Sequence, residues 1–358
     1  MKSLVQLTIA ILVVCALLFV AVDQLESSGG GGSKDTLTVY NWGEYIDPEL
    51  LQKFEEETGM KVIYETFDSN EAMLTKVRQG GSAYDIAVPS EYTVESMKEE
   101  NLLIPIDHTL VPNIEHIDED FLNLSFDPGN EFSIPYFWGT VGIVFNPNLI
   151  PEHLDFTSWD DLWDPALKDK VFLVDGSREV IGMGLNSIGQ SLNVKDATLL
   201  REATDKLKTL SPNIKAVIGD EITPLMVNNE ASVALTFSGQ AADMMWENEE
   251  LDFAVPQEGS NLFFDTMVIP KTSKNVEGAH KFINFMLDPE NAAQNADYVG
   301  YSTPNASALA LMDEEVTSDE RFYPNQELRD KLEVYENLGL EWLGIYNEHF
   351  LEFKMSLQ

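Results

Sequence analysis

Residues 36–90 decide the fold, and they read TLTVYNWGEYIDPELLQKFEEETGMKVIYETFDSNEAMLTKVRQGGSAYDIAVPS. Three short apolar runs, TLTVYN, KVIYET and DIAVPS, are typical of strands in a sheet. Asp47 and Ser69 stand where helix N-caps are expected, because their side chains can accept from free backbone N–H groups. Gly59 and Gly80 stand where the two helices should end. The stretch therefore predicts a βαβαβ unit.

The same alternation returns after residue 165. VFLVD, IKAVIG and VALTF are predicted strands, and helices are expected from about Arg178 and over about residues 196–210. Two longer apolar stretches, SIPYFWGTVGIVFN at 133–146 and LFFDTMVIP at 262–270, are candidates for crossings between two units. The sequence thus predicts an α/β protein with two lobes, each a sheet flanked by helices.

The composition favours a folded chain with a cationic partner. Of the 358 residues, 44% are hydrophobic, and 61 Asp and Glu against 22 Lys and Arg give a formal charge of -39. This charge repels phosphates, so no nucleic acid partner is expected. A single cysteine excludes an internal disulfide, and the five histidines show no metal-ligand spacing, so no metal and no cofactor are expected. Acidic clusters such as 55–57 are expected to be solvated faces.

The N-terminus is typical of an exported protein. Residues 4–22 are almost wholly apolar, follow Lys2, and are long enough to cross a bilayer as a helix. We therefore expect residues 1–22 to be an export segment that anchors the protein, with the bulk on the extracytoplasmic face of the membrane or in a periplasm-equivalent space. Lipidation of Cys15 is the less favoured alternative, because valine and not a small residue precedes it. Residues 23–35, rich in Gly and Ser, are expected to be a flexible linker.

Rings and carboxylates recur just after the predicted strands. In open α/β sheets ligands bind at the carboxyl ends of strands. Ring faces accept methylene chains and attract ammonium groups, and carboxylates pair with the charged ends, so this lining suits an elongated organic cation. The residues concerned are Trp42, Tyr45, Ser90, Tyr92, Asp175, Glu179, Phe237, Phe263 and Asp265.

Structural explanations compete with this interpretation. Trp42 and Tyr45 are also compatible with core packing, and Asp175 with the N-cap of the next helix. Glu179 lies in a first helical turn, where an acid is favoured by the helix dipole. Asp265 is harder to explain in this way, because a carboxylate in an apolar stretch is expensive to bury without a partner.

Other functions remain open at this point. Glu179 and Asp265 are compatible with a secreted carbohydrate-active enzyme, and the closely spaced Tyr298 and Tyr301 with a ferric-ion binder. The chain has no G-x-S-x-G elbow, no P-loop and no G-x-G-x-x-G motif. A binding protein without catalytic activity is therefore the favoured prediction.

An ordered set of motifs resembles one known family. The motifs are YNWGEY, FDSNEAM, YDIAVPSEY, FDPGNEFSIPYFWGT, DGSREV, VIPK, FINFML and GYSTPN. From about Thr36 to the C-terminus the chain is similar to the spermidine/putrescine-binding proteins of ABC importers. The resemblance implies a type II periplasmic-binding-protein fold, a polyamine ligand, an ABC permease partner and a monomeric receptor. It implies a first lobe of residues 36–141 and 264–309 and a second lobe of residues 142–263 and 310–358, joined by crossing strands.

The resemblance also implies roles for single residues. Trp42, Tyr45, Ser90 and Tyr92 carry over from the first lobe, and Glu179 and Asp265 are the expected amine-pairing acids. Phe237 and Phe263 stand where the family often has Trp. Three positions depart from its pattern. Gly43 replaces a hydroxyl residue, and Tyr335 replaces a Gln. At the position where the family has an acid this chain has Gly176, and its own acid, Asp175, lies one residue earlier. The preference among putrescine, spermidine and spermine is thus open.

Overall fold

The computed structural model describes residues 35–219 and 221–357, and its first part is the predicted βαβαβ unit. Strand β1 pairs in parallel with β2 and β3. The elements are β1 (Thr36–Trp42), α2 (Pro48–Thr58), β2 (Lys61–Phe67), α3 (Asn70–Gln79), β3 (Ile86–Ala87), α4 (Glu91–Glu99) and β4 (Leu103–Ile104). The predicted export segment and nearly all of the linker lie outside the described residues.

The helix ends of this unit follow the predicted signals. The Asp47 carboxylate accepts from the Glu49 N–H at 2.8 Å, and the Ser69 hydroxyl accepts from the Ala72 N–H at 3.2 Å. Gly59 ends α2 with a φ of 72°, a left-handed conformation that glycine adopts without strain. The acidic face of α2 is less solvated than expected, because Glu55 Oε1 accepts from the Val62 N–H at 2.7 Å.

The second α/β unit follows the long apolar stretch at 133–146. Strand β6 pairs in parallel with β7 and β8, as in the first unit. Its elements are β6 (Val171–Val174), α5 (Ser177–Asn186), α6 (Ala197–Thr209), β7 (Ile214–Ile218), α7 (Ile222–Val227), β8 (Val233–Phe237), α8 (Ser238–Glu247) and β9 (Asp252–Ala254). The helix predicted to begin near Arg178 is α5. Its N-cap is Gly176, which has no side chain to bond to the helix, so the alternative that Asp175 is the N-cap is wrong.

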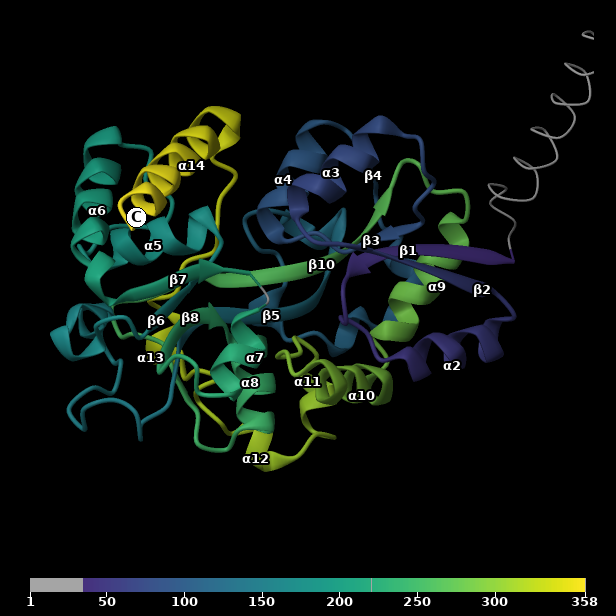
Figure 1. Cartoon of the computed structure of the whole chain (residues 1–358). Coiled ribbons are helices and arrows are strands. Elements are labelled where there is room, and N and C mark those ends of the chain that lie inside the picture. Colours follow the sequence, from purple (N-terminus) through teal and green to yellow (C-terminus); the bar gives the residue numbers. More distant parts are fainter. Residues whose placement is uncertain (1–34, 220, 358) are drawn as a thin grey trace, which may run out of the picture.

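Two long antiparallel strands cross between the units. They are β5 (Ser133–Phe145) and β10 (Leu262–Pro270), paired from Thr140 opposite Leu262 to Ser133 opposite Val268. Strand β10 also pairs with β3 and β4, and β5 with β8 and β9. The strand order is therefore β2-β1-β3-β10-β5-β8-β6-β7 (Figure 1). The prediction of crossing strands is confirmed.

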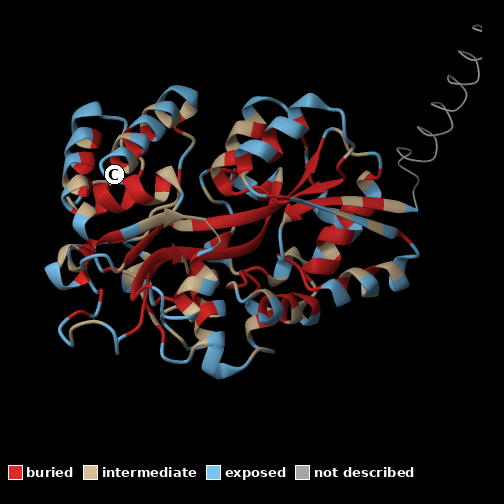
Figure 2. Cartoon of the chain, in the orientation of Figure 1, coloured by how far each residue is buried: buried red, intermediate tan, exposed pale blue. Residues whose placement is uncertain are grey.

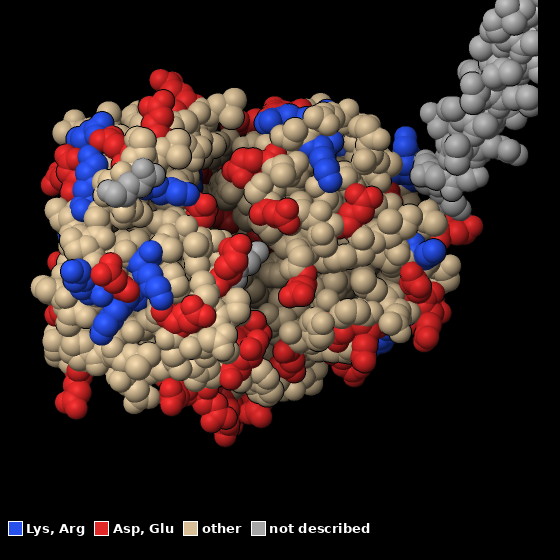
Figure 3. Space-filling view, viewed as in Figure 1, with Lys and Arg blue, Asp and Glu red and all other residues tan. Residues whose placement is uncertain are grey.

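The buried side chains form separate cores on either side of these crossings. One core joins residues between 37 and 138 to residues between 264 and 296. A second joins residues between 141 and 235 to residues of the last helix, and a third lies among residues between 144 and 253. Figure 2 shows buried backbone along the whole of β5 and most of β10. On the basis of these cores we propose the lobe limits given above. The surface is hollowed between the lobes, and acidic side chains border the hollow (Figure 3).

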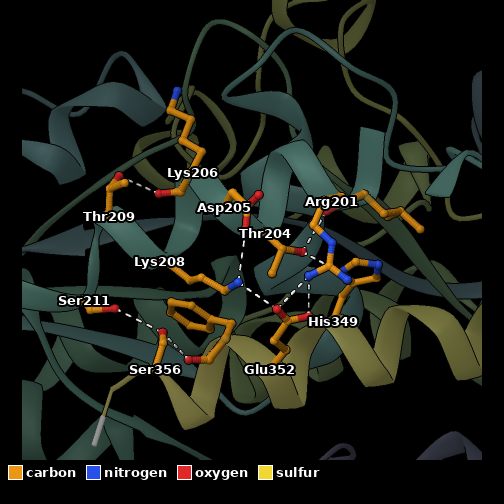
Figure 4. Close-up of polar contacts among 12 residues, drawn as sticks. Arg201, Thr204, Asp205, Lys206, Lys208, Thr209, Ser211, His349, Glu352 and Ser356 are labelled. Atoms are coloured by element: carbon orange, nitrogen blue, oxygen red, sulfur yellow. Dashed lines mark hydrogen bonds and ion pairs between the residues drawn. The ribbon is translucent and has the colours of Figure 1, made fainter. Parts of the chain in front are cut away.

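The chain returns to the second lobe at its C-terminus. Helix α14 (Gly339–Met355) packs on α6, and Figure 4 shows the polar contacts between them. Glu352 accepts from Arg201 at 2.6 Å and Lys208 at 2.7 Å, and the His349 ring lies 2.9 Å from the Thr204 hydroxyl. These contacts hold α14 on α6. The other helices are α9 (Val276–Met286), α10 (Pro289–Val299), α11 (Ala306–Leu309), α12 (Glu314–Thr317) and α13 (Gln326–Arg329), and short 3-10 helices lie at 108–110, 112–116, 119–121, 128–130, 159–163, 165–167 and 211–213.

Candidate ligand-binding site

Asp265 lies within β10, next to the segments that follow the C-terminal ends of β1 and β3. It is 6% exposed, and its two carboxylate oxygens have separate donors. Oδ2 accepts from the Tyr45 hydroxyl and Oδ1 from the Ser90 hydroxyl, both at 2.7 Å. Tyr45 follows β1 and Ser90 follows β3, so the sheet brings together three residues that are up to 220 positions apart. Tyr45 and Ser90 follow strands as the sequence predicts, whereas Asp265 lies within a strand.

Asn70, which the sequence analysis did not single out, holds this cluster from behind. Its side-chain nitrogen donates to the Ser90 hydroxyl at 3.0 Å and to the Tyr92 hydroxyl at 2.9 Å. Its side-chain oxygen accepts from the Ser90 N–H at 3.1 Å. A polar residue at the start of α3, inside the motif FDSNEAM, was the available signal. Asn70 therefore orients two predicted site residues.

Asp265 of β10 and Glu91 at the start of α4 are both buried acids. Burial raises the pKa of Asp265 to about 6, although the bonds from Tyr45 and Ser90 lower it. Glu91 is fully buried, and its Oε2 accepts from the Phe264 N–H at 2.9 Å. Its Oε1 has no hydrogen-bond partner within the described part of the chain, and burial raises the pKa of Glu91 to about 8. A bound cation would stabilise the charged form of both acids.

Glu179 and Tyr335 form a second group, in the other lobe. Glu179 lies in the first turn of α5. Burial raises its pKa, while its own backbone N–H, the charge of Arg178 and the Tyr335 hydroxyl lower it. The buried Tyr335 ring meets the Tyr92 ring edge-on, with 6.4 Å between the ring centres. This contact joins helix α4 of the first lobe to the segment before α14.

Arg178 is a buried cation next to this group. Its guanidinium lies 4.1 Å from the centre of the Tyr335 ring. It donates to the Asn193 side chain at 2.8 Å and to the Glu336 carbonyl at 3.3 Å. The bond to Glu336 ties Arg178 to the segment before α14, which contains Tyr335.

A series of aromatic rings connects the lobes. Tyr45 contacts Tyr301 with 5.1 Å between ring centres, Tyr301 contacts Phe263 at 6.1 Å, and Phe263 contacts Phe237 at 5.6 Å. The sequence analysis linked Tyr301 only with Tyr298 in the ferric-ion alternative. Tyr298 is 57% exposed, so the two tyrosines face different surroundings. Only the fold shows that Tyr301 belongs to the ring series.

Two predicted residues lie outside these contacts. Asp175 is exposed and pairs with Lys354 at 2.7 Å, so the structure does not bring it to Asp265 or to the rings. The Trp42 ring packs on Phe67 with 4.5 Å between ring centres, and its buried ring nitrogen has no hydrogen-bond partner among the residues described. Residues 35–219 and 221–357 contain no cluster of three or more His, Cys, Asp or Glu that could hold a metal ion.

Comparison with known proteins places the chain among binding proteins of transporters. The spermidine/putrescine-binding periplasmic protein of Salmonella typhimurium is 37% identical over 92% of this chain and 94% of its own length. The crystal structure of the spermidine/putrescine ABC transporter substrate-binding protein PotD from Streptococcus pneumoniae is 56% identical, with a TM-score of 0.84 over 90% of this chain and 100% of that one. A structure from Listeria monocytogenes, assigned to spermidine/putrescine ABC transport, is 60% identical, with a TM-score of 0.85 over 90% and 99% of the two chains.

The family model for the bacterial extracellular solute-binding protein matches residues 49–324. This match spans most of the chain, and the solved relatives share its fold with 56% and 60% identity. The resemblance seen in the sequence motifs is therefore confirmed. The chain belongs to the family of bacterial extracellular solute-binding proteins.

Proposed function

We propose that this protein is an extracytoplasmic polyamine receptor that takes up spermidine or putrescine between its lobes and delivers it to an ABC permease. The observation that carries the proposal is Asp265, a buried carboxylate held by the hydroxyls of Tyr45 and Ser90 beside a series of rings. A second acid, Glu179, lies in the other lobe. The named relatives are binding proteins of polyamine transporters, which gives no support to the carbohydrate-active enzyme.

The arrangement binds a polyamine by a simple division of roles. Asp265 and Glu179 pair with ammonium groups, and the rings of Tyr45, Tyr301 and Phe263 cover the methylene chain between them. Because these residues come from both lobes, a ligand makes its full set of contacts only when the lobes are closed. Binding therefore shifts the protein toward the closed form. We propose that the receptor is a monomer and that the permease recognises this closed form.

Polyamines should raise the melting temperature of the protein. A ligand that binds only the folded state stabilises it by RT ln(1 + [L]/Kd), which is about 2.7 kcal/mol at a hundredfold excess over Kd. Thermal unfolding with spermidine, putrescine, glucose, phosphate and ferric citrate measures this directly. Stabilisation by a sugar or by ferric citrate, without any by the amines, would show that the ligand class is wrong.

Gly239→Ala should weaken polyamine binding by about tenfold. A Cβ at Gly239 would lie 2.1 Å from the Tyr301 ring, so this ring must shift and its contacts with Tyr45 and Phe263 change. Calorimetric titration measures the loss. Gly344→Ala on α14 is the matched control, because a Cβ there meets nothing within 4 Å and should leave affinity unchanged. Equal affinities for both variants would contradict the role of the ring series.

The location at the membrane belongs to the same proposal. In the described ranges, 35–219 and 221–357, no helix is long and apolar enough to span a membrane. We propose that the apolar run at 4–22 anchors the protein. The Cys15→Ala variant should therefore stay in the membrane fraction, and its mass should differ from that of the native protein only by the substitution. A protein without residues 1–35 should be soluble and keep its full polyamine affinity. Release of Cys15→Ala into the medium would instead favour lipidation.

A further inference from the structure

One face of helix α4 carries three glutamates at four-residue spacing, which places them one turn apart. Glu91 is fully buried and accepts from the Phe264 N–H of β10. Glu95, one turn further along, is half-buried and accepts from the Asn337 N–H at 2.7 Å. Glu99, exposed at the end of the helix, accepts from the Asn337 side chain at 3.3 Å. Two of the three glutamates therefore join α4 to Asn337.

These bonds pass from one proposed lobe to the other. Helix α4 belongs to the first lobe, and Asn337 lies in the segment before α14, which belongs to the second (Figure 1). Asn193, between α5 and α6, fastens this segment to the second lobe. Its side chain donates to the Val334 carbonyl and accepts from the Glu336 N–H, both at 2.9 Å. Asn337 is thus held by the second lobe and bonds to the first.

The bond between Glu95 and Asn337 favours the closed form independently of the ligand. It joins a carboxylate to a backbone N–H, and a bond to a charged group contributes more than a neutral one. It lies one turn of α4 beyond the contact between Tyr92 and Tyr335, and neither Asp265 nor Glu179 takes part in it. Moving the lobes apart would separate Glu95 from Asn337, so this bond stabilises only the closed arrangement.

We propose that Glu95 and Asn337 form a clasp that holds the lobes closed over a bound polyamine, so that Glu95 is a positioning residue that sets how long the ligand stays bound. The inference rests on the proposed function and deepens it. A bond that forms after the ligand has entered the cleft slows dissociation and leaves the association rate unchanged. Because the clasp does not touch the ligand, its effect should be the same for putrescine and spermidine.

Glu95→Ala should raise the dissociation rates of putrescine and spermidine by the same factor, about tenfold, without a change in the association rates. Alanine is the best helix former, so α4 should keep its structure. Stopped-flow fluorescence of the native tryptophans measures both rates. Glu99→Ala is the matched control: it makes the same change of charge one turn away, but removes only the longer, exposed bond. Its dissociation rates should stay within about threefold of the native values.

Glu95→Gln separates the hydrogen bond from the charge. The amide oxygen of glutamine can still accept from the Asn337 N–H, although the negative charge is lost. We expect this variant to release both polyamines within about threefold of the native rates. If Glu95→Gln releases them as fast as Glu95→Ala does, Glu95 acts through its charge and the clasp is wrong.

Hydrogen exchange at the Asn337 amide observes the clasp directly. With saturating spermidine this N–H should exchange slowly in the native protein and in Glu95→Gln. It should exchange faster in Glu95→Ala, because the acceptor that protects it is gone. Exchange at the same rate in the native protein and in Glu95→Ala would show that the bond does not hold the lobes together.

The outcomes distinguish the clasp from the receptor function. If the native protein binds polyamines and Glu95→Ala releases them at the native rates, the clasp is wrong although the receptor function stands. If the native protein binds neither putrescine nor spermidine, the receptor function fails. The exchange rates of the Asn337 amide in the free native protein and in free Glu95→Ala then decide whether the clasp exists.

Discussion

Asp265→Asn should weaken polyamine binding by about 2–5 kcal/mol, which is roughly thirtyfold or more, while the ligand-free protein becomes no less stable. The ammonium loses a buried carboxylate, and an amide cannot replace its charge. In the ligand-free protein the raised pKa of Asp265, about 6, means that the ionised group destabilises the fold at neutral pH. Calorimetric titration measures the first effect and urea unfolding the second.

Two further variants make this result specific. Glu179→Gln should also weaken binding, because it removes the acid of the other lobe. Glu56→Gln on the exposed face of α2 is the control and should change neither quantity. Its neighbour Glu55 is unsuitable, because it bonds to the Val62 N–H of β2. If Asp265→Asn binds polyamines normally but unfolds at a lower urea concentration, Asp265 has a structural role and the assignment of the site is wrong.

Polyamine affinity should fall by about tenfold for each pH unit below about 6. The ligand needs an ionised Asp265, whose pKa in the free protein is about 6, so below this pH the ligand must first displace a proton. The amines do not contribute, because groups of this type stay protonated up to about pH 10. Titrations at pH 7, 6 and 5 measure the slope, and Asp265→Asn should reduce it. The slope that remains comes from Glu179, whose pKa burial also raises.

The stability of the free protein should change in the opposite direction. A carboxyl whose folded pKa lies above its unfolded value favours folding when protonated, so the contribution of Asp265 to stability rises as the pH falls from about 7 to about 4. A comparison with Asp265→Asn over this range isolates that contribution. A pH-independent polyamine affinity in the native protein would show that Asp265 does not pair with the ligand.

Local sequence signals predict the elements because their causes are local. Asp47 and Ser69 cap the helices after them with bonds that span two or three residues, and Gly59 ends α2 in a conformation that glycine adopts readily. One strand is shorter than its apolar run indicates: DIAVPS contributes only Ile86–Ala87 as strand, because the chain after Pro89 turns into α4. Tertiary context decided that limit.

The sequence by itself determined the two α/β units, the crossing strands and the strand-end position of Tyr45 and Ser90, since periodicity and capping depend on neighbouring residues. Only the tertiary structure decided what faces these groups. The Asp265 carboxylate of β10 accepts from the Tyr45 and Ser90 hydroxyls, which follow other strands, and the burial of Asp265 raises its pKa. Lys354 pairs with Asp175 across 179 positions. Such contacts depend on which surfaces meet after folding, so the residues near each group in the sequence do not predict them.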